Sequence, residues 1–415
     1  MQVTTFGAIF GLLLAIFLIV KKFEPVYGLM IGAFLGGIIG GADINSTIEF
    51  MANGAMGIAP SILRVLASGV LAGSLIKTRA VDKISEEIIK ILGEKRAILG
   101  IALSTLVLAS VGINLDVAII TVAPVGLCIG QKLNYSKMSI LLAMLGGGKA
   151  GNIISPNPNT LAVSENFSVN LLSVMQANII PAIIILIMTT LLAKTLIHKG
   201  SYILQNNKND DEKDLPGLFP SLIGPIVSMV LMFIGNISDV SIDPLIALPL
   251  GGMVTIIATK NLKNTNECVA FGLNKMQGVC ILLLGSGTLA GIIQVSGIQE
   301  STINLLNILN IPQFLLAPIA AIFMSLATAS STTSAMITSA TFSDAIISAG
   351  LSPLSGASIV NTGACVFEQL PHGSLFHSSS QSVSIDIKER LKLIPYEVFI
   401  GIIFTAVSTA FQLLT

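Results

Sequence analysis

The sequence predicts an all-α polytopic membrane protein, with about ten full spans and two re-entrant hairpins arranged as an inverted repeat. Three observations lead to this fold class. Hydrophobic residues make up 53% of the 415 residues and charged residues only 11%, whereas soluble domains carry about 25% charged residues. Apolar stretches of membrane-spanning length follow one another along the chain, and one set of motifs occurs twice. This composition excludes an ordinary soluble enzyme and a secreted protein held by disulfides.

The predicted spans are stretches of mostly apolar residues, because about 20 residues of helix cross the hydrocarbon core of a bilayer. They cover residues 3–20, 25–41, 58–76, 138–163, 171–193, 219–235, 244–259, 269–295, 354–384 and 393–414. Two further stretches, 97–130 and 312–348, are too long for one helix and are interrupted by polar residues halfway. Each is either two spans or a re-entrant hairpin that enters and leaves on the same side.

The basic residues predict which loops face the cytoplasm, since cytoplasmic loops carry the excess of Lys and Arg. With the N-terminus outside and both long stretches re-entrant, 20 of the 22 basic residues fall in inside loops. The outside loops, of which 42–57 is one, hold none, and Arg64 and Lys149 lie within spans. This arrangement predicts a cell (inner) membrane protein with both termini outside. The 22 basic residues balance 22 acidic ones, so nothing indicates a nucleic-acid partner.

An internal repeat favours the re-entrant interpretation. The motif Ser-Gly-x-Leu-Ala-Gly at residues 68–73 returns at 286–291, an offset of 218 residues, and the same offset carries the polar middle 110–116 onto 328–334. An offset of 215 matches Pro156 to Pro371. The two copies start on opposite sides, which is the build of many secondary transporters. The predicted organisation is N-terminal scaffold spans 1–57, a first repeat 58–197, a cytoplasmic linker 198–218, scaffold spans 219–268 and a second repeat 269–415.

Four segments of irregular backbone at membrane depth form the candidate site, because such backbone is tolerated only inside protein or along a wet cavity. They are the hairpin tips 110–116 and 328–334 and the broken spans 146–160 and 361–374. Pro156 and Pro158 make continuous helix through the first break nearly impossible. Exposed helix N-termini there would attract an anion, and freed carbonyls would suit a cation. The candidate substrate- and ion-binding residues are Asn114, Asp116, Lys149, Asn152, Ser155, Asn157, Asn159, Thr160, Ser331, Thr332, Thr333, Glu368, His372 and Ser374.

The ionisable residues within spans have two open roles each, since their insertion is costly. Asp116 carries a proton or binds a cation, or it pairs with Lys149 or Arg64. Lys149 attracts a carboxylate, or it pairs with Asp116 or Glu368. Snorkelling or ion pairing is expected for Arg64. His377 is expected to hydrogen-bond a backbone carbonyl.

Carboxylates in the outside loops, Glu165 and Asp243 among them, are expected to be solvated. The amphipathic run 80–92 is expected to lie in the membrane interface.

The breaks also carry a family resemblance. Residues 151–160 (GNIISPNPNT), together with 361–363 (NTG), 376–378 (FHS) and 384–389 (SIDIKE), resemble the signatures of the gluconate permease (GntP) family. The resemblance implies the ion-transporter superfamily fold, with a scaffold, a mobile transport domain and elevator-type movement, usually as a homodimer. It places the family's polar break positions on Ser155, Asn157, Asn159, Thr160, His372 and Ser374, with Asn157 where the family has His.

The expected function is therefore a secondary active transporter that imports a small organic anion, a gluconate-like sugar acid or hydroxycarboxylate, by proton symport. A Na+-coupled di- or tricarboxylate symporter and the membrane subunit of a Na+-pumping decarboxylase stay open as alternatives. No cofactor is expected, and the expected partners are the organic anion, the lipid bilayer and a second copy of the chain. An enzyme is not expected, because the sequence has no nucleophile–His–carboxylate set and no metal-ligand cluster.

Overall fold

The computed structural model describes residues 3–21, 23–202, 215–237, 242–297, 312–371 and 373–414, and its described elements are helices without a strand. The first half contains α1 (Thr5–Val20), α2 (Pro25–Ile39), α3 (Ile44–Gly57), α4 (Ala59–Lys77), α5 (Ala80–Leu92), α6 (Ala97–Ser110), α7 (Leu115–Leu133), α8 (Lys137–Asn152), α9 (Pro158–Asn166), α10 (Leu171–Ala177) and α11 (Ile179–Thr195). The second half contains α12 (Leu218–Ile237), α13 (Pro244–Ala258), α14 (Thr265–Gln294), α16 (Leu316–Thr328), α17 (Ser331–Ser348), α18 (Pro353–Gly363), α19 (Ser374–Ser382), α20 (Ile387–Leu391) and α21 (Ile394–Leu414). Most of the predicted linker, residues 203–214, lies outside the described residues.

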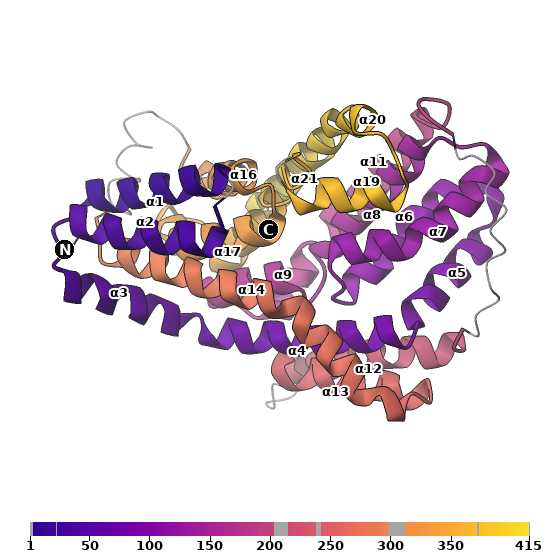
Figure 1. Cartoon of the computed structure of the whole chain (residues 1–415), viewed down its shortest axis with the longest axis horizontal. Coiled ribbons are helices and arrows are strands. Elements are labelled where there is room, and N and C mark those ends of the chain that lie inside the picture. Colours follow the sequence, from indigo (N-terminus) through magenta and orange to yellow (C-terminus); the bar gives the residue numbers. More distant parts are fainter. Residues whose placement is uncertain are drawn as a thin grey trace.

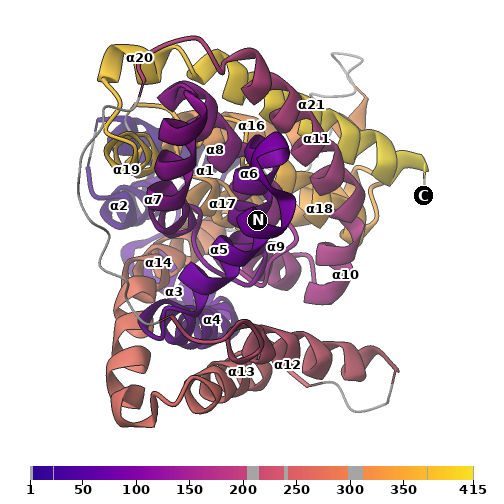
Figure 2. The ribbon, with the colours of Figure 1, turned by 90° about the vertical axis from the view of Figure 1, so that its right-hand side faces the viewer.

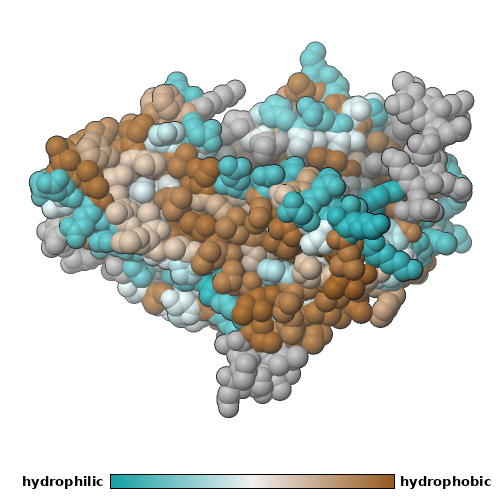
Figure 3. Space-filling model, turned by 60° about the horizontal axis from the view of Figure 1, so that its bottom comes forward, coloured by the Kyte–Doolittle hydropathy of each residue, from teal (hydrophilic) through white to brown (hydrophobic). Residues whose placement is uncertain are grey.

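The outer surface of the helices is apolar, as the predicted membrane environment requires. Phe219 and Ile226 on α12 are 71% and 52% exposed, and Ile246 on α13 is 55% exposed. Figure 3 shows this hydrophobic surface over the face that carries α12 and α13. Apolar patches of this extent mark a surface that meets lipid or protein rather than water.

Helix length alone supports fewer spans than the ten predicted. Within the described ranges, Leu262–Gln294 and Ile387–Leu414 are long and apolar enough to cross a bilayer, and three bent pairs raise the number to five. The helices α1, α2 and α13 are apolar but shorter than 18 residues. In α12 the apolar stretch Leu218–Met232 is also shorter than 18 residues. The helical, membrane-type fold is confirmed, and the number of ten spans stays a prediction.

The segment 42–57 is helix rather than the predicted outside loop. Asp43 starts α3 by accepting hydrogen bonds from the Asn45 and Ser46 backbone amides, at 2.9 and 3.1 Å. The helix then continues into α4 through a bend of 41°. The loop prediction was wrong because the segment is short of large apolar residues, and only its packing against α14 shows how it is used.

The α3–α4 pair and α14 are equivalent under the 218-residue offset, which carries α14 onto residues 47–76. They cross at two places where six glycines meet: Gly54 with Gly287 and Gly291, and Gly272 with Gly69 and Gly73. Exchanging the halves turns the first set of contacts into the second. The crossing therefore has two-fold symmetry, which supports the inverted repeat and extends its first copy back to the start of α3.

These crossings are close enough to predict the effect of an added methyl group. A Cβ on Gly73 or Gly291 would meet the backbone of the facing helix, and overpacking of this kind costs about 1–3 kcal/mol. We expect Gly73→Ala and Gly291→Ala to lower thermal stability in detergent by similar amounts. Gly57→Ala is the matched control, because nothing lies within 4 Å of its Cβ position. A large effect at one crossing and none at the other would contradict the symmetry.

The predicted hairpins are pairs of antiparallel helices, α6 with α7 and α16 with α17. Each tip faces the break of the neighbouring broken span. At the first tip, a Cβ on Gly112 would stand 3.8 Å from Pro156, and at the second tip, one on Gly373 would stand 2.8 Å from the Ala329 side chain. The hairpins and breaks gather in the middle of the molecule, while α1, α2 and α3 extend to one end (Figure 1). α12 and α13 form a separate layer beneath α4 and α14 (Figure 2).

A buried ion pair fixes the C-terminal helices. Arg390 on α20 is fully buried and forms a two-pronged ion pair with Glu397 on α21, which is 1% exposed. Its Nε also donates to Ser379 Oγ at 3.3 Å, and its guanidinium lies 5.0 Å from the Phe376 ring centroid. Arg390 belongs to a predicted inside loop, and the structure shows that its side chain is buried in the core.

Candidate functional site

The first break is built by a proline pair and an asparagine cap. α8 ends at Asn152 and α9 begins at Pro158, so the chain leaves the helix where Pro156 and Pro158 predict. Asn157 Oδ1 accepts hydrogen bonds from the Thr160 amide at 3.0 Å and the Thr160 hydroxyl at 3.2 Å. Its Nδ2 donates to the Asn152 carbonyl at 2.6 Å. Asn157 therefore caps α9 and closes the break, and the ligand contact predicted for it stays a prediction.

The second break runs from the end of α18 at Gly363 to the start of α19 at Ser374. The Ser325 hydroxyl on α16 holds it in place by donating to the Ala364 carbonyl at 2.7 Å and accepting from the Phe367 amide at 2.9 Å. His377 Nε2 lies 2.8 Å from the Pro371 carbonyl, which confirms the backbone partner expected for this imidazole. The candidate His372 lies outside the described residues.

A cavity of about 240 Å³ lies where both tips and both breaks meet. It is lined by Asn114, Leu115, Asp116, Asn152, Asn159, Gly278, Val279, Leu282, Ala329, Ser330, Ser331, Thr332, Thr333, Glu368 and Leu375. Eight of these are predicted site residues, from four segments that lie far apart in the sequence. Thr332 Oγ1 donates to Asn159 Oδ1 at 2.7 Å and so ties the second tip to the first break.

Three helix N-termini contribute to this cavity. α7 begins at Leu115 after Asn114, and α17 begins at Ser331 after Ser330, whose hydroxyl accepts from the Thr333 amide at 3.2 Å. α9 adds Asn159 from its first turn. Unpaired backbone N–H groups and the positive end of the helix dipole favour an anion at such a place.

Two carboxylates face the same cavity. Asp116 Oδ1 accepts from the Val117 amide at 2.9 Å, and neither Lys149 nor Arg64, its expected partners, forms an ion pair with it. Glu368 is 2% exposed and lines the cavity from the second break. The cavity therefore combines three helix N-termini with two acidic side chains.

Lys149 lies behind the cavity wall and joins the two breaks. Its side chain is 1% exposed, and Nζ donates to the Cys365 carbonyl and to Gln369 Oε1, both at 2.7 Å. Glu368 Oε1 lies 3.2 Å from Nζ. Of the two pairings open for Lys149, the structure has the one with Glu368.

The remaining predicted residues have other places. Ser155 and Thr160 are fully buried within the first break, where Thr160 Oγ1 accepts from Asn361 Nδ2 at 3.3 Å. Ser374 is the first residue of α19. The sequence interpretation missed the wall that α14 supplies through Gly278, Val279 and Leu282. No signal in the sequence marks these residues, because they are ordinary apolar positions of a long helix.

Arg64 forms a second cluster beside a separate cavity of about 380 Å³. It pairs with Glu165 on α9 and with Asp243 before α13, with Nη2 2.8 Å from Asp243 Oδ2. The ion pairing expected for Arg64 is confirmed, whereas Glu165 and Asp243 are not simply solvated, because the guanidinium draws both carboxylates to it. The hydrogen bond from Arg64 holds the pKa of Asp243 below its usual value. The pair is therefore complete above the ordinary aspartate pKa and is lost only as the pH falls through a lower value.

Comparisons with known proteins agree with this geometry. A family profile described as GntP family permease matches residues 3–248. A Haemophilus influenzae protein named uncharacterized transporter is 48% identical over 98% of this chain and 97% of its own length. A second protein of that organism, named uncharacterized permease, is 24% identical over 92% of this chain and 87% of its own. Among solved structures, the Alcanivorax borkumensis YdaH transporter, described as having an unusual topology, matches with a TM-score of 0.65 over 88% of each chain at 12% identity, a likeness of fold alone.

Proposed function

Because this chain belongs to the GntP permease family and is a membrane transporter, we propose that it imports a small hydroxy-acid anion, such as gluconate, together with a proton. The cavity between the tips and breaks is the observation that carries the proposal. At about 240 Å³, it is smaller than the roughly 300–1,000 Å³ of pockets for drug-sized ligands. A small acid of a few carbons suits this volume.

The lining of the cavity supports a hydroxylated anion in particular. Three helix N-termini supply a positive potential for the carboxylate. The hydroxyls of Ser331 and Thr332 and the amides of Asn114, Asn152 and Asn159 are donors and acceptors for substrate hydroxyls. A purely apolar substrate would leave these groups unpaired, which is costly.

The proposal of a proton as coupling ion rests on the two carboxylates of the lining, Asp116 and Glu368. Na+ coupling is the alternative, since carbonyls freed at broken helices suit that ion. Transport domain and scaffold would then move against each other in an elevator, with the hairpins and breaks carrying the substrate. We also propose that both termini lie outside the inner membrane, on the basis of the sorted Lys and Arg residues. A homodimer is proposed because the family resemblance implies one.

Uptake into proteoliposomes tests the function directly. Purified protein is reconstituted, and entry of labelled gluconate is measured with an inward proton gradient, with an inward Na+ gradient and with neither. We expect accumulation under the proton gradient alone. Accumulation driven only by Na+ would assign the other ion. Failure to move gluconate, other hydroxy acids or dicarboxylates under either gradient, with protein correctly inserted, would refute the proposal.

A further inference from the structure

The charges around the cavity do not suit an anion as they stand. Asp116 and Glu368 line it, and Lys149 lies behind Glu368. With all three ionised, the group carries one net negative charge, and Glu368 cancels the ammonium that would otherwise attract a substrate. Interactions between charges are strong at a buried site because the effective dielectric constant is low. An empty site in this state therefore opposes entry of an anion.

Glu368 is held by charge rather than by hydrogen bonds. Lys149 donates its two hydrogen bonds to Cys365 and Gln369, and Glu368 Oε1 is buried without a hydrogen-bond partner. A buried polar atom without a partner normally has an explanation in the function of the site. The nearest charged group to Oε1 is Lys149 Nζ, at 3.2 Å, so a proton taken up by this carboxylate would release the ammonium from the ion pair.

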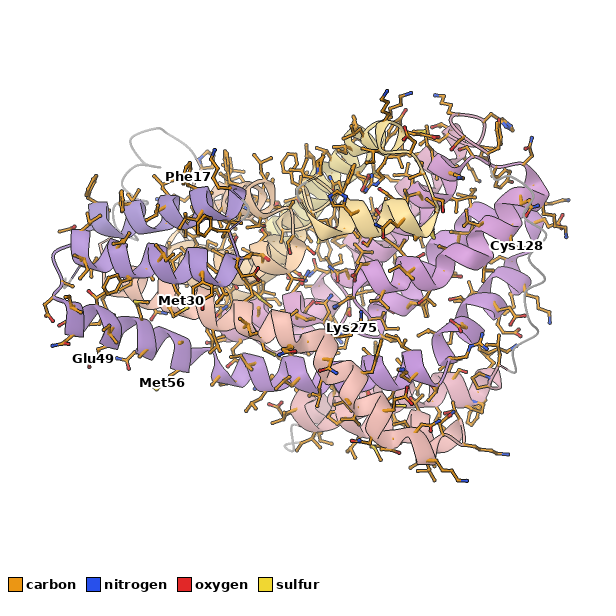
Figure 4. All side chains as sticks on the ribbon, in the orientation of Figure 1. Phe17, Met30, Glu49, Met56, Cys128 and Lys275 are labelled. Atoms are coloured by element: carbon orange, nitrogen blue, oxygen red, sulfur yellow. The ribbon has the colours of Figure 1, made fainter. Side chains whose placement is uncertain are left out.

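Other charged and titratable groups surround this carboxylate on several elements. Asp116 belongs to the first turn of α7, and Cys365 lies three residues before Glu368 in the same break. On α14, Lys275 lies one turn before Gly278, with its Nζ 5.6 Å from the Phe271 ring centroid (Figure 4). His377 on α19 is engaged with the Pro371 carbonyl. Among these, Lys149 is the partner in ion-pair contact, at 3.2 Å.

Building on the proposed function, we propose that Glu368 is the residue that carries the transported proton, and that Lys149 is its positioning residue. A proton from the outer solution binds the Glu368 carboxylate, and the ammonium behind it is no longer cancelled. The net charge of the site then rises from minus one to zero, and the released ammonium attracts the substrate carboxylate. On the inner side the proton leaves Glu368, the pair with Lys149 forms again, and the anion is expelled.

The charge balance of this cycle fixes its electrical behaviour. The empty carrier has one net negative charge at the site, the protonated carrier has none, and a monovalent anion restores one negative charge. Loaded and empty forms therefore cross with the same charge. Uptake of a monovalent acid is expected to be electroneutral.

The test compares two variants of cavity carboxylates, Glu368→Gln and Asp116→Asn, with the unaltered protein. Binding of labelled gluconate is measured from pH 5 to 8, and exchange of labelled for unlabelled gluconate is measured in proteoliposomes without any gradient. In the unaltered protein, affinity is expected to fall up to about tenfold per pH unit at the alkaline end. Glu368→Gln is expected to bind independently of pH and to exchange, but to lose accumulation under a proton gradient. Asp116→Asn is expected to keep the pH dependence. The Arg64 cluster should not contribute to the pH dependence of gluconate binding, because the lowered pKa of Asp243 keeps its carboxylate ionised from pH 5 to 8.

Two results would overturn the assignment of Glu368: an unchanged pH profile in Glu368→Gln, or a profile that disappears in Asp116→Asn. If Glu368→Gln does not fold, the electrical prediction still decides. A potential imposed with potassium and valinomycin at constant pH gradient should leave the steady-state accumulation of gluconate by the unaltered protein unchanged, and a clear dependence of that accumulation on potential would refute the cycle. The absence of any exchange by the unaltered protein would instead refute the proposed function.

Discussion

Replacement of Lys149 by methionine is expected to abolish accumulation of substrate, with a loss of at least about 100-fold in the initial rate. The change leaves Glu368 buried without its cation, and an unpaired buried charge costs about 3–5 kcal/mol, which corresponds to a factor of about 100 or more in an equilibrium. It also removes the donors that hold the Cys365 carbonyl and Gln369, so the second break loses one of its contacts with the first. Initial rates of gluconate uptake into proteoliposomes, normalised to folded protein, measure the effect.

Two further variants separate transport from folding. Lys149→Met combined with Glu368→Gln removes both charges, so thermal stability should largely return while proton-driven accumulation stays absent. Lys275→Met on α14 is the matched lysine control, because its side chain is exposed, and it should transport normally. Normal uptake by Lys149→Met would contradict a role for the ammonium in the site. Loss of uptake in Lys275→Met would show that the assay responds to any lost lysine.

Replacement of Arg390 by alanine is expected to destabilise the protein by about 3–5 kcal/mol, because it leaves the buried Glu397 carboxylate without its ion-pair partner. The guanidinium also leaves Ser379 without its donor and Phe376 without its cation–π contact. The apparent melting temperature of the purified protein in detergent, followed by a thiol-reactive dye or by intrinsic tyrosine fluorescence, checks this. Because the cluster lies away from the cavity lining, protein that folds at low temperature should still bind gluconate.

The control for Arg390 comes from the same short helix. Lys388→Ala also removes a positive charge from α20, but the side chain is exposed, so the melting temperature should change little. Arg390→Met with Glu397→Met should recover much of the lost stability, since it leaves no unpaired charge in the core. Equal melting temperatures for Arg390→Ala and Lys388→Ala would show that the buried pair does not stabilise the fold.

The breaks and tips could be predicted from the sequence because their causes are local. Pro156 and Pro158 prevent helix wherever the chain places them, and short runs of Gly, Ser and Thr in apolar surroundings indicate where helices end. The two-fold organisation could also be predicted, because the glycine motif at 68–73 returns at 286–291. In the structure the two motifs form equivalent contacts at the two crossings. Eight of the residues predicted from these signals line one cavity in the structure.

Other features depend on contacts that no local pattern encodes. Whether Lys149 pairs with Asp116 or with Glu368 is decided by the distance between two breaks more than 200 residues apart in sequence. The helix cap formed by the Asn157 amide depends on how the chain folds back between Asn152 and Thr160. The helix α3 packs against α14 in the structure, a long-range contact that the sequence of residues 42–57 does not indicate.

The exchange of contacts between α4 and α14 has a consequence for the direction of transport. A scaffold whose halves are interchangeable supports two arrangements related by the two-fold axis, open to opposite sides, at similar free energy. A preference between them then requires a feature present in only one half. At the offset that matches the breaks, Lys149 corresponds to Ala364 and Glu368 to Ile153, so neither charge has a counterpart. This pair of side chains is thus expected to favour one of the two orientations of the carrier at rest.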